Sequence, residues 1–168
     1  MPDKAPKSHP IEQTQLFLRI KHPTLDPKEI TAVLGMQPEH SVTAGDNVSS
    51  AGVRRLFNET YWLAALPSWS QPPFGKPPER STGALSEFFP EFSAEDRKLL
   101  MRVANPYDFS LIAWLRRLDV HRAFIAHINQ TDGSVTLLLT RRNKEAPYTL
   151  LPSIAKRLSE LGLALEID

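Results

Sequence analysis

Fifteen prolines are spread unevenly along this 168-residue chain, and six of them fall within residues 67–90. A proline removes a backbone N–H donor and fixes φ, so neither a helix nor a central strand can run through such a stretch. We therefore predict an inserted proline-rich loop at 67–92, which is either functional or simply mobile. Three more prolines stand among polar residues in 1–13, where we expect a flexible N-terminal tail.

The chain between these two segments opens with a strand and then a helix. Apolar and polar side chains alternate over residues 14–21, which predicts a strand with one buried face. Asp26 is a natural N-cap, Pro27 suits the first helical position, and Gly35 suits a left-handed C-cap. The spacing therefore predicts a helix between Asp26 and Gly35.

The remaining pattern predicts an α+β fold of one domain over residues 14–168, with amphipathic helices packed on one face of a mainly antiparallel or mixed β-sheet. Before the proline-rich loop we expect an irregular segment at 36–52 and then one bent strand or two strands at 53–65. After the loop, periodicity predicts a short helix beginning at Ser93 and ending before Pro106, and a second helix at 105–118. The chain should end with strands at 121–129 and 134–141 joined by a hairpin turn at 131–133, a helix ending at Gly162 and a last strand at 163–167.

Composition excludes several classes of protein. The chain has no cysteine, so it forms no disulfides and no thiolate metal sites. Its 20 Lys and Arg residues against 19 Asp and Glu residues give a net charge of +1, which argues against nucleic-acid binding. No apolar run approaches the ~20 residues of a membrane span, and the first residues lack the apolar core of a signal peptide. We expect a cytoplasmic protein.

No motif for catalysis, phosphate binding or metal binding is present. The sequence contains no HExxH, no GxSxG and no GxxxxGK[ST]. On the predicted strand, His121 and His127 would stand ~20 Å apart, too far to share one metal ion. We therefore predict no catalytic residues, no metal and no cofactor. His40 could act as a base, although no orienting partner is identifiable.

Four residues are the predicted partner-binding set: Arg55, Trp62, Trp69 and Phe74. Together with Phe57 and Tyr61, Arg55 and Trp62 could build a sheet surface that stacks bases; the alternative for Arg55 is a solvated or ion-paired side chain. Trp69 and Phe74 lie in the proline-rich segment, where they must either dock on the core or meet a partner. Proline-restricted chains lose little entropy on binding, which makes partner recognition physically reasonable.

Several local patterns resemble the bacterial domain-of-unknown-function 4279 family. The residues that carry the resemblance are LDPKEITAVLGMQP from Leu25 to Pro38, then Gly45, the strand at Tyr61–Trp62–Leu63, and the closing IAKRLSELGLALEID from Ile154 to Asp168. The resemblance implies a small α+β domain with no established activity, in which Gly35, Pro38, Gly45 and Trp62 are architectural. Residues 67–104 look like an insertion relative to this pattern.

The sequence thus favours a small non-catalytic protein-interaction module that binds through the open face of the sheet and residues 67–92. Immunity or antitoxin-like binding is one form of that role, by analogy only. The alternative is an enzyme whose polar site assembles over the sheet from His40, Arg55 or Asp46. A third hypothesis is weak binding of single-stranded nucleic acid.

Deletion of residues 68–90 tests the predicted role of the proline-rich segment. The deletion variant should keep the fold, because the predicted core lies elsewhere, and should no longer capture its partner in a pull-down from native lysate. Partner recovery equal to that of the full chain would contradict the prediction.

Overall fold

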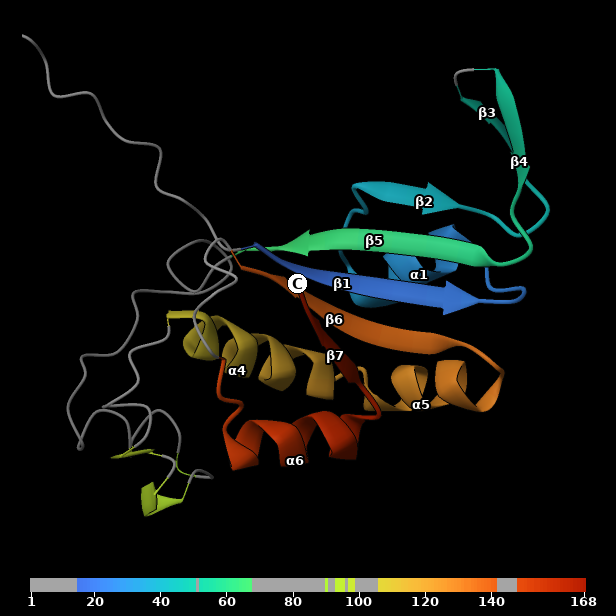
Figure 1. Cartoon of the computed structure of the whole chain (residues 1–168). Coiled ribbons are helices and arrows are strands. Elements are labelled where there is room, and N and C mark those ends of the chain that lie inside the picture. The colour runs from blue at the N-terminus through green and yellow to red at the C-terminus, as the bar shows by residue number, and fades with distance from the viewer. Residues whose placement is uncertain are drawn as a thin grey trace, which may run out of the picture.

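The computed structural model describes residues 15–50, 52–67, 90, 93–95, 97–98, 106–141 and 148–168, so the predicted tail and nearly all of the predicted proline-rich loop lie outside the described residues. Figure 1 shows the arrangement of the elements. Their bounds are β1 Gln15–His22, α1 Pro27–Leu34, β2 His40–Val42, β3 Asn47–Ser50, β4 Val53–Leu56, β5 Thr60–Leu66, α4 Pro106–Asp119, α5 Arg122–Gln130, β6 Ser134–Thr140, α6 Pro152–Leu161 and β7 Ala164–Ile167.

A five-stranded sheet in the order β2-β5-β1-β6-β7 forms the centre of the structure. The central strand β1 pairs antiparallel with both β5 and β6, whereas β7 pairs parallel with β6 after a crossover through α6. A separate two-stranded sheet is formed by β3 and β4. The predicted fold class, α+β with a mainly antiparallel mixed sheet, is confirmed.

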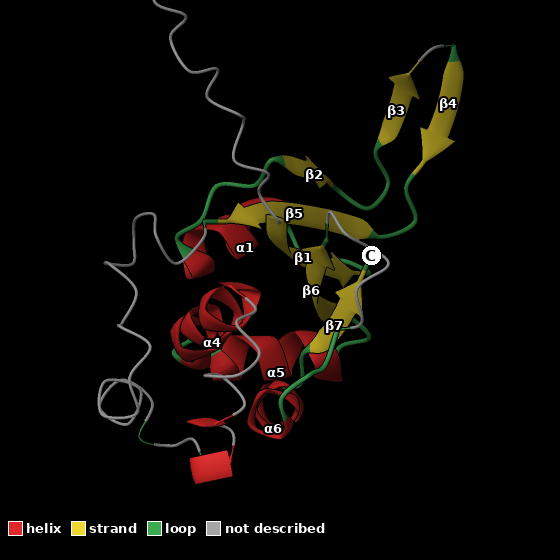
Figure 2. Ribbon diagram, turned by 60° about the vertical axis from the view of Figure 1, so that its left-hand side comes forward, coloured by secondary structure: helices red, strands yellow, loops and turns green. Residues whose placement is uncertain are grey.

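One face of the sheet supplies the core. The alternation predicted for β1 is present: Leu16, Leu18 and Ile20 are buried, while the side chains between them are only partly buried. Figure 2 shows α1, α4, α5 and α6 on the same side of the five-stranded sheet. Buried side chains of all four helices join the β1 residues in one apolar cluster, and its largest members are Trp62 and Trp114.

Local capping explains why the predicted helices form where they do. The Asp26 carboxylate accepts a hydrogen bond from the backbone N–H of Lys28 at 2.8 Å, which satisfies one free donor of the first turn of α1. Gly35 ends α1 and Gly162 ends α6, each with a positive φ that other residues adopt only with strain. These two predicted helix ends, α4 and the last strand β7 are confirmed.

The strand predicted at 121–129 is wrong, because this segment forms helix α5. Its apolar side chains alternate well enough to suggest a strand, yet Ile125 and Ile128 are the ones buried, three residues apart, as on a helix face. The segment predicted to be a hairpin turn ends helix α5 instead. Asp132 has a φ of 62°, and the N–H groups of Thr131 and Gly133 both donate to the carbonyl of Ile128.

Residues 36–65 contain more strand than the sequence predicted. The segment 36–52 was expected to be irregular, but it holds β2 and β3. The ambiguous stretch 53–65 divides into two strands in different sheets, since β4 pairs with β3 and β5 joins the main sheet. Short strands with exposed side chains carry too few apolar positions to show a period of two.

A hydroxyl on α1 anchors the largest buried side chain of the sheet. Trp62 is completely buried, and its indole N–H donates to the hydroxyl of Thr31 at 3.1 Å. That hydroxyl in turn donates to the carbonyl of Pro27 at 3.0 Å. The helix therefore satisfies the one polar group of the indole, which would otherwise lose its hydrogen bond away from water.

Thr31→Val should lower the free energy of unfolding by about 1–3 kcal/mol, because it leaves a buried N–H without an acceptor. Thr31→Ser keeps the hydroxyl and should cost less than about 1 kcal/mol. Urea denaturation of both variants measures the difference. Equal costs for Val and Ser would show that the hydrogen bond to Trp62 contributes nothing.

Candidate functional site

The hairpin of β3 and β4 projects away from the rest of the described structure (Figures 1 and 2). We call residues 47–56 the arm. Hydrogen bonds at its base hold it to the chain: Gly45 N–H donates to the Phe57 carbonyl at 2.7 Å, and Phe57 N–H donates to the Asp46 carbonyl at 3.1 Å. The strand register is therefore fixed below the arm, although the arm itself forms only a two-stranded sheet.

The arm exposes apolar side chains on both of its faces. Val48 on β3 lies directly opposite Arg55 on β4, and Val53 lies two residues before Arg55 on β4. Because directly opposite residues and residues two apart point to the same side, these three side chains share one face. Leu56 shares the other face with Arg54. The exposed fractions are 42% for Val48, 58% for Val53 and 65% for Leu56. Only Val33 and Val120 join them as exposed large hydrophobic residues in the described part of the chain.

The arm is also basic. It contains Arg54 and Arg55 and no acidic residue. Both arginine side chains are exposed, and neither side chain forms a hydrogen bond or an ion pair with another described residue. The arm thus combines a charge of +2 with an apolar surface, on a chain whose net charge is only +1.

Of the predicted partner-binding set, the structure describes only Arg55 and Trp62, and it does not bring these two together. Arg55 lies on the arm, but Trp62 is buried under α1 and cannot touch a partner, so its prediction as a contact residue is corrected. Neighbouring Tyr61 points to the opposite face of β5, since side chains alternate along a strand, and the predicted base-stacking surface is therefore not formed. Trp69 and Phe74 lie outside the described residues.

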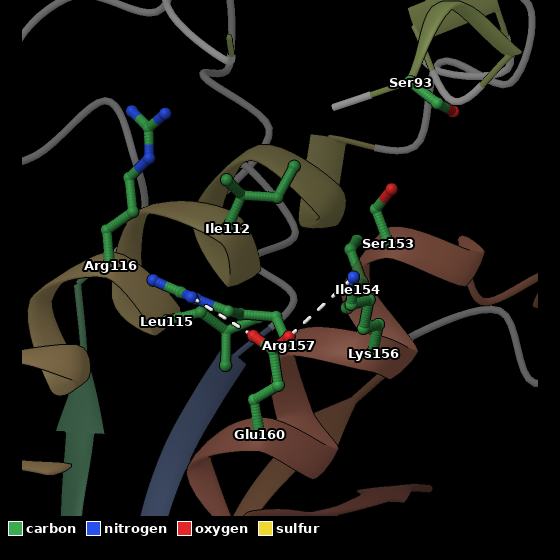
Figure 3. A pocket seen from close by; sticks show the side chains of 9 residues that line it. All are labelled: Ser93, Ile112, Leu115, Arg116, Ser153, Ile154, Lys156, Arg157 and Glu160. Carbon is green, nitrogen blue, oxygen red and sulfur yellow. Dashed lines mark hydrogen bonds and ion pairs between the residues drawn. The ribbon is translucent and has the colours of Figure 1, made fainter. Parts of the chain in front are cut away.

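A pocket of about 380 Å³ lies between α4 and α6 (Figure 3). We call it the α4–α6 pocket. Its lining combines buried apolar side chains with polar and charged ones: Ser93, Ile112, Leu115, Arg116, Ser153, Ile154, Lys156, Arg157 and Glu160. No residue of this pocket was among the predicted partner-binding residues, because α4 and α6 are far apart in the sequence and no local pattern links them.

Charged side chains of α6 are bound to one another at this pocket. Figure 3 shows the Glu160 carboxylate between two cations, with Arg157 Nη1 at 3.2 Å and Lys156 Nζ at 3.9 Å. Arg157 also reaches the end of α4, where its Nη2 lies 2.8 Å from Asp119 Oδ2. These contacts hold the Arg157 guanidinium in a defined position between the two helices.

A buried carboxyl group lies in the first turn of α4. Asp108 is 2% exposed, and its Oδ1 accepts a hydrogen bond from the Tyr148 hydroxyl at 3.0 Å. Burial raises the pKa of Asp108 from its ordinary 3.8 to about 6, although the hydrogen bond from Tyr148 opposes the change. Burial and the neighbouring carboxylate also raise the pKa of Tyr148, whose ring lies under the Arg141 guanidinium.

Residues considered for catalysis are placed apart. Within the described ranges, His40, Asp46 and Arg55 form no hydrogen bond or ion pair with one another: the His40 ring meets the Tyr61 ring with centroids 5.9 Å apart, and Asp46 Oδ2 accepts from Thr43 N–H at 3.0 Å. His121 and His127 lie at the start and in the last turn of α5 rather than along a strand.

The buried histidine has a structural role. His22 Nδ1 lies 2.9 Å from the backbone nitrogen of Leu25 and 3.1 Å from that of Thr24, and both N–H groups donate to it. Its Nε2 lies 2.8 Å from the Thr131 hydroxyl, which joins the end of β1 to the end of α5. Among the described residues, no three His, Asp or Glu side chains are grouped so that they could hold a metal ion.

No family model matches the chain, and no curated protein or solved structure matches it either. Of the helices in the described ranges, none is long and apolar enough to cross a membrane.

The raised pKa of Asp108 predicts a pH-dependent stability. A carboxyl group whose pKa is higher in the folded chain stabilises the fold at low pH, and this contribution is lost as pH rises towards and through 6. The total loss is about 3 kcal/mol, of which roughly 2 kcal/mol falls between pH 4.5 and 7.5.

Asp108→Asn removes this titration and keeps an acceptor for the Tyr148 hydroxyl. Its stability relative to the native chain, measured in urea, should therefore rise by roughly 2 kcal/mol between pH 4.5 and 7.5. Asp132→Asn, at an exposed position, is the control and should show no such trend. A constant difference for Asp108→Asn would contradict the assignment.

Proposed function

We propose that this chain is a non-catalytic protein-interaction module that docks through the arm. The observation that carries the proposal is the exposure of Val48, Val53 and Leu56 on a hairpin that projects from the sheet. An isolated two-stranded hairpin is only marginally stable in water. Burial of each of these side chains against a partner would contribute roughly 1 to 2 kcal/mol, and it would order the arm at the same time.

The charge of the arm indicates which kind of protein it fits. Arg54 and Arg55 lie on opposite faces of the hairpin, each beside an exposed apolar side chain. A complementary surface would therefore be an apolar depression with carboxylates at its rim. Exposed charges at such a rim act mainly on the association rate and are screened by salt, so binding by the arm should weaken as ionic strength rises.

The open face of the sheet offers a further surface away from the arm: the chain returns from the arm into β5 at Thr60, whereas Phe17 lies opposite Ala65 near the other end of that strand. Phe17 and Leu138 are half-buried there and lie directly opposite each other on β1 and β6. The ion pair of Arg19 with Glu166, at 2.7 Å, borders them, and a second pair, Lys21 with Glu59 at 3.3 Å, lies further along β1 towards the arm. An apolar centre with a charged border is the usual composition of a protein-binding surface.

Immunity or antitoxin-like binding is one proposed form of this role. We also propose that the chain belongs to the domain-of-unknown-function 4279 family and that it lies in the cytoplasm. The support for the first is an analogy between small cysteine-free α+β domains. Support for the second comes from the motif around α1 and from the closing segment of α6 and β7.

An enzymatic role is the second candidate, and the buried Asp108–Tyr148 pair favours it, because strongly shifted pKa values gather at functional sites. The interaction role is preferred. In the described part of the chain no histidine bonds to a carboxylate, so no base–orienter pair accompanies Asp108. Nucleic-acid binding by the two arginines is left as an outcome of the test, since β3 and β4 carry no aromatic side chain on which bases could stack.

Val53→Ser/Leu56→Ser tests the proposal, because it removes apolar surface from both faces of the arm without changing its charge. We expect at least a tenfold loss of partner recovery in quantitative co-purification from native lysate, and an equal rise in Kd once the partner is purified. Val120→Ser is the matched control: this valine is 83% exposed but lies outside the arm, on the turn between α4 and α5.

Recovery by the arm variant equal to that of the control would overturn the proposal, provided that circular dichroism shows the same fold for both. Retention of a labelled single-stranded oligonucleotide at low salt, abolished by Arg54→Gln/Arg55→Gln, would replace it with nucleic-acid binding.

A further inference from the structure

The helix layer carries a second candidate site, independent of the arm and of the proposed docking. We propose that the α4–α6 pocket binds a small oxyanion, a carboxylate or a phosphate monoester, carried on a short apolar body. The proposal rests on the size of the pocket, on its apolar floor and on the balance of its charged groups.

The dimensions and floor of the pocket suit a small organic molecule. Its volume of about 380 Å³ lies within the range of ligand pockets, roughly 300–1,000 Å³. Ile112 and Leu115 of α4 and Ile154 of α6 line it, and each belongs to the core with at most 2% exposure. These side chains are fixed by packing, so the apolar part of the site is preformed.

The polar lining favours negative charge. Arg116, Lys156 and Arg157 contribute three cations, against the carboxylate of Glu160 in the lining and that of Asp119, which lies 2.8 Å from Arg157. The lining alone has a net charge of +2, and Asp119 reduces the balance at the pocket to +1. Arginine and lysine side chains only donate hydrogen bonds, and the hydroxyl of Ser153 adds another donor. An anionic ligand with several acceptor oxygens matches this set, whereas an organic cation does not.

The cations are arranged so that one is fixed and another can turn. Arg157 is held by Asp119 at 2.8 Å and by Glu160 at 3.2 Å, which orders its guanidinium before a ligand arrives. Lys156 makes only a long contact of 3.9 Å with Glu160, and its side chain is 77% exposed. It can therefore turn to an incoming anion without losing a short hydrogen bond. Figure 3 shows Arg116 on α4 and Ser153 on α6, on either side of the pocket.

Four six-carbon probes of different charge test the chemistry directly: hexanoate, hexyl phosphate, hexylammonium and hexan-1-ol. Each is titrated into the full ¹⁵N-labelled chain, and backbone amide shifts are followed by NMR. Hexanoate and hexyl phosphate should shift amides of residues 112–116 and 153–160, while hexylammonium and hexan-1-ol should not. Inorganic phosphate, which has no apolar body, should bind at least tenfold more weakly than hexyl phosphate.

Lys156→Gln should raise the Kd for hexanoate and hexyl phosphate at least fivefold, and this exposed position allows the substitution without loss of the fold. Lys28→Gln, on the exposed side of α1, is the control and should leave both Kd values unchanged. Equal shifts with hexylammonium, shifts confined to other residues, no shifts with either anion, or unchanged affinity in Lys156→Gln would each overturn the proposal.

Discussion

Most of this structure follows from the central strand β1, which pairs with another strand on both edges and has only one face covered by helices. Leu16, Leu18 and Ile20 point into the core, and the partners that β5 and β6 set beside them are equally buried. A shift of the register by one residue would move this entire apolar set to the open face, so the register is strongly specified. The helices then close over the buried face and leave the other face of β1 partly exposed.

The same constraint explains the position of the arm. The chain enters β2 at one edge of the sheet and re-enters at β5, its neighbour. Strands β3 and β4, which lie between these two strands in the sequence, have no place in the five-stranded sheet, and they pair with each other instead. The apolar side chains of β3 and β4 therefore remain in water, and their burial by a partner would be favourable. The α4–α6 pocket belongs to the helix layer, so a ligand there and a partner on the arm would occupy separate surfaces.

Elements with local signals were predictable from the sequence. Asp26 and Gly35 bound α1 by capping, and the alternation around Leu18 identified β1 without any tertiary information. The strand prediction for residues 121–129 failed because a nine-residue segment with apolar side chains at several positions fits both the strand period of two and the helix period of 3.6. Only the packing of Ile125 and Ile128 decides between them. The arm was missed as a unit, since β3 and β4 are short and expose the side chains of Val48, Val53 and Leu56, and the pocket joins helices that are distant in the sequence.

Amide hydrogen exchange of the arm, in the free chain and in the partner complex, tests the central claim most directly. We expect fast exchange at Val48, Arg54 and Arg55 in the free chain, because a two-stranded hairpin opens easily, and strong protection of the same amides in the complex. The amides of β1 should be protected in both states. A complex in which the arm exchanges as fast as in the free chain would contradict the claim that the arm is the docking surface.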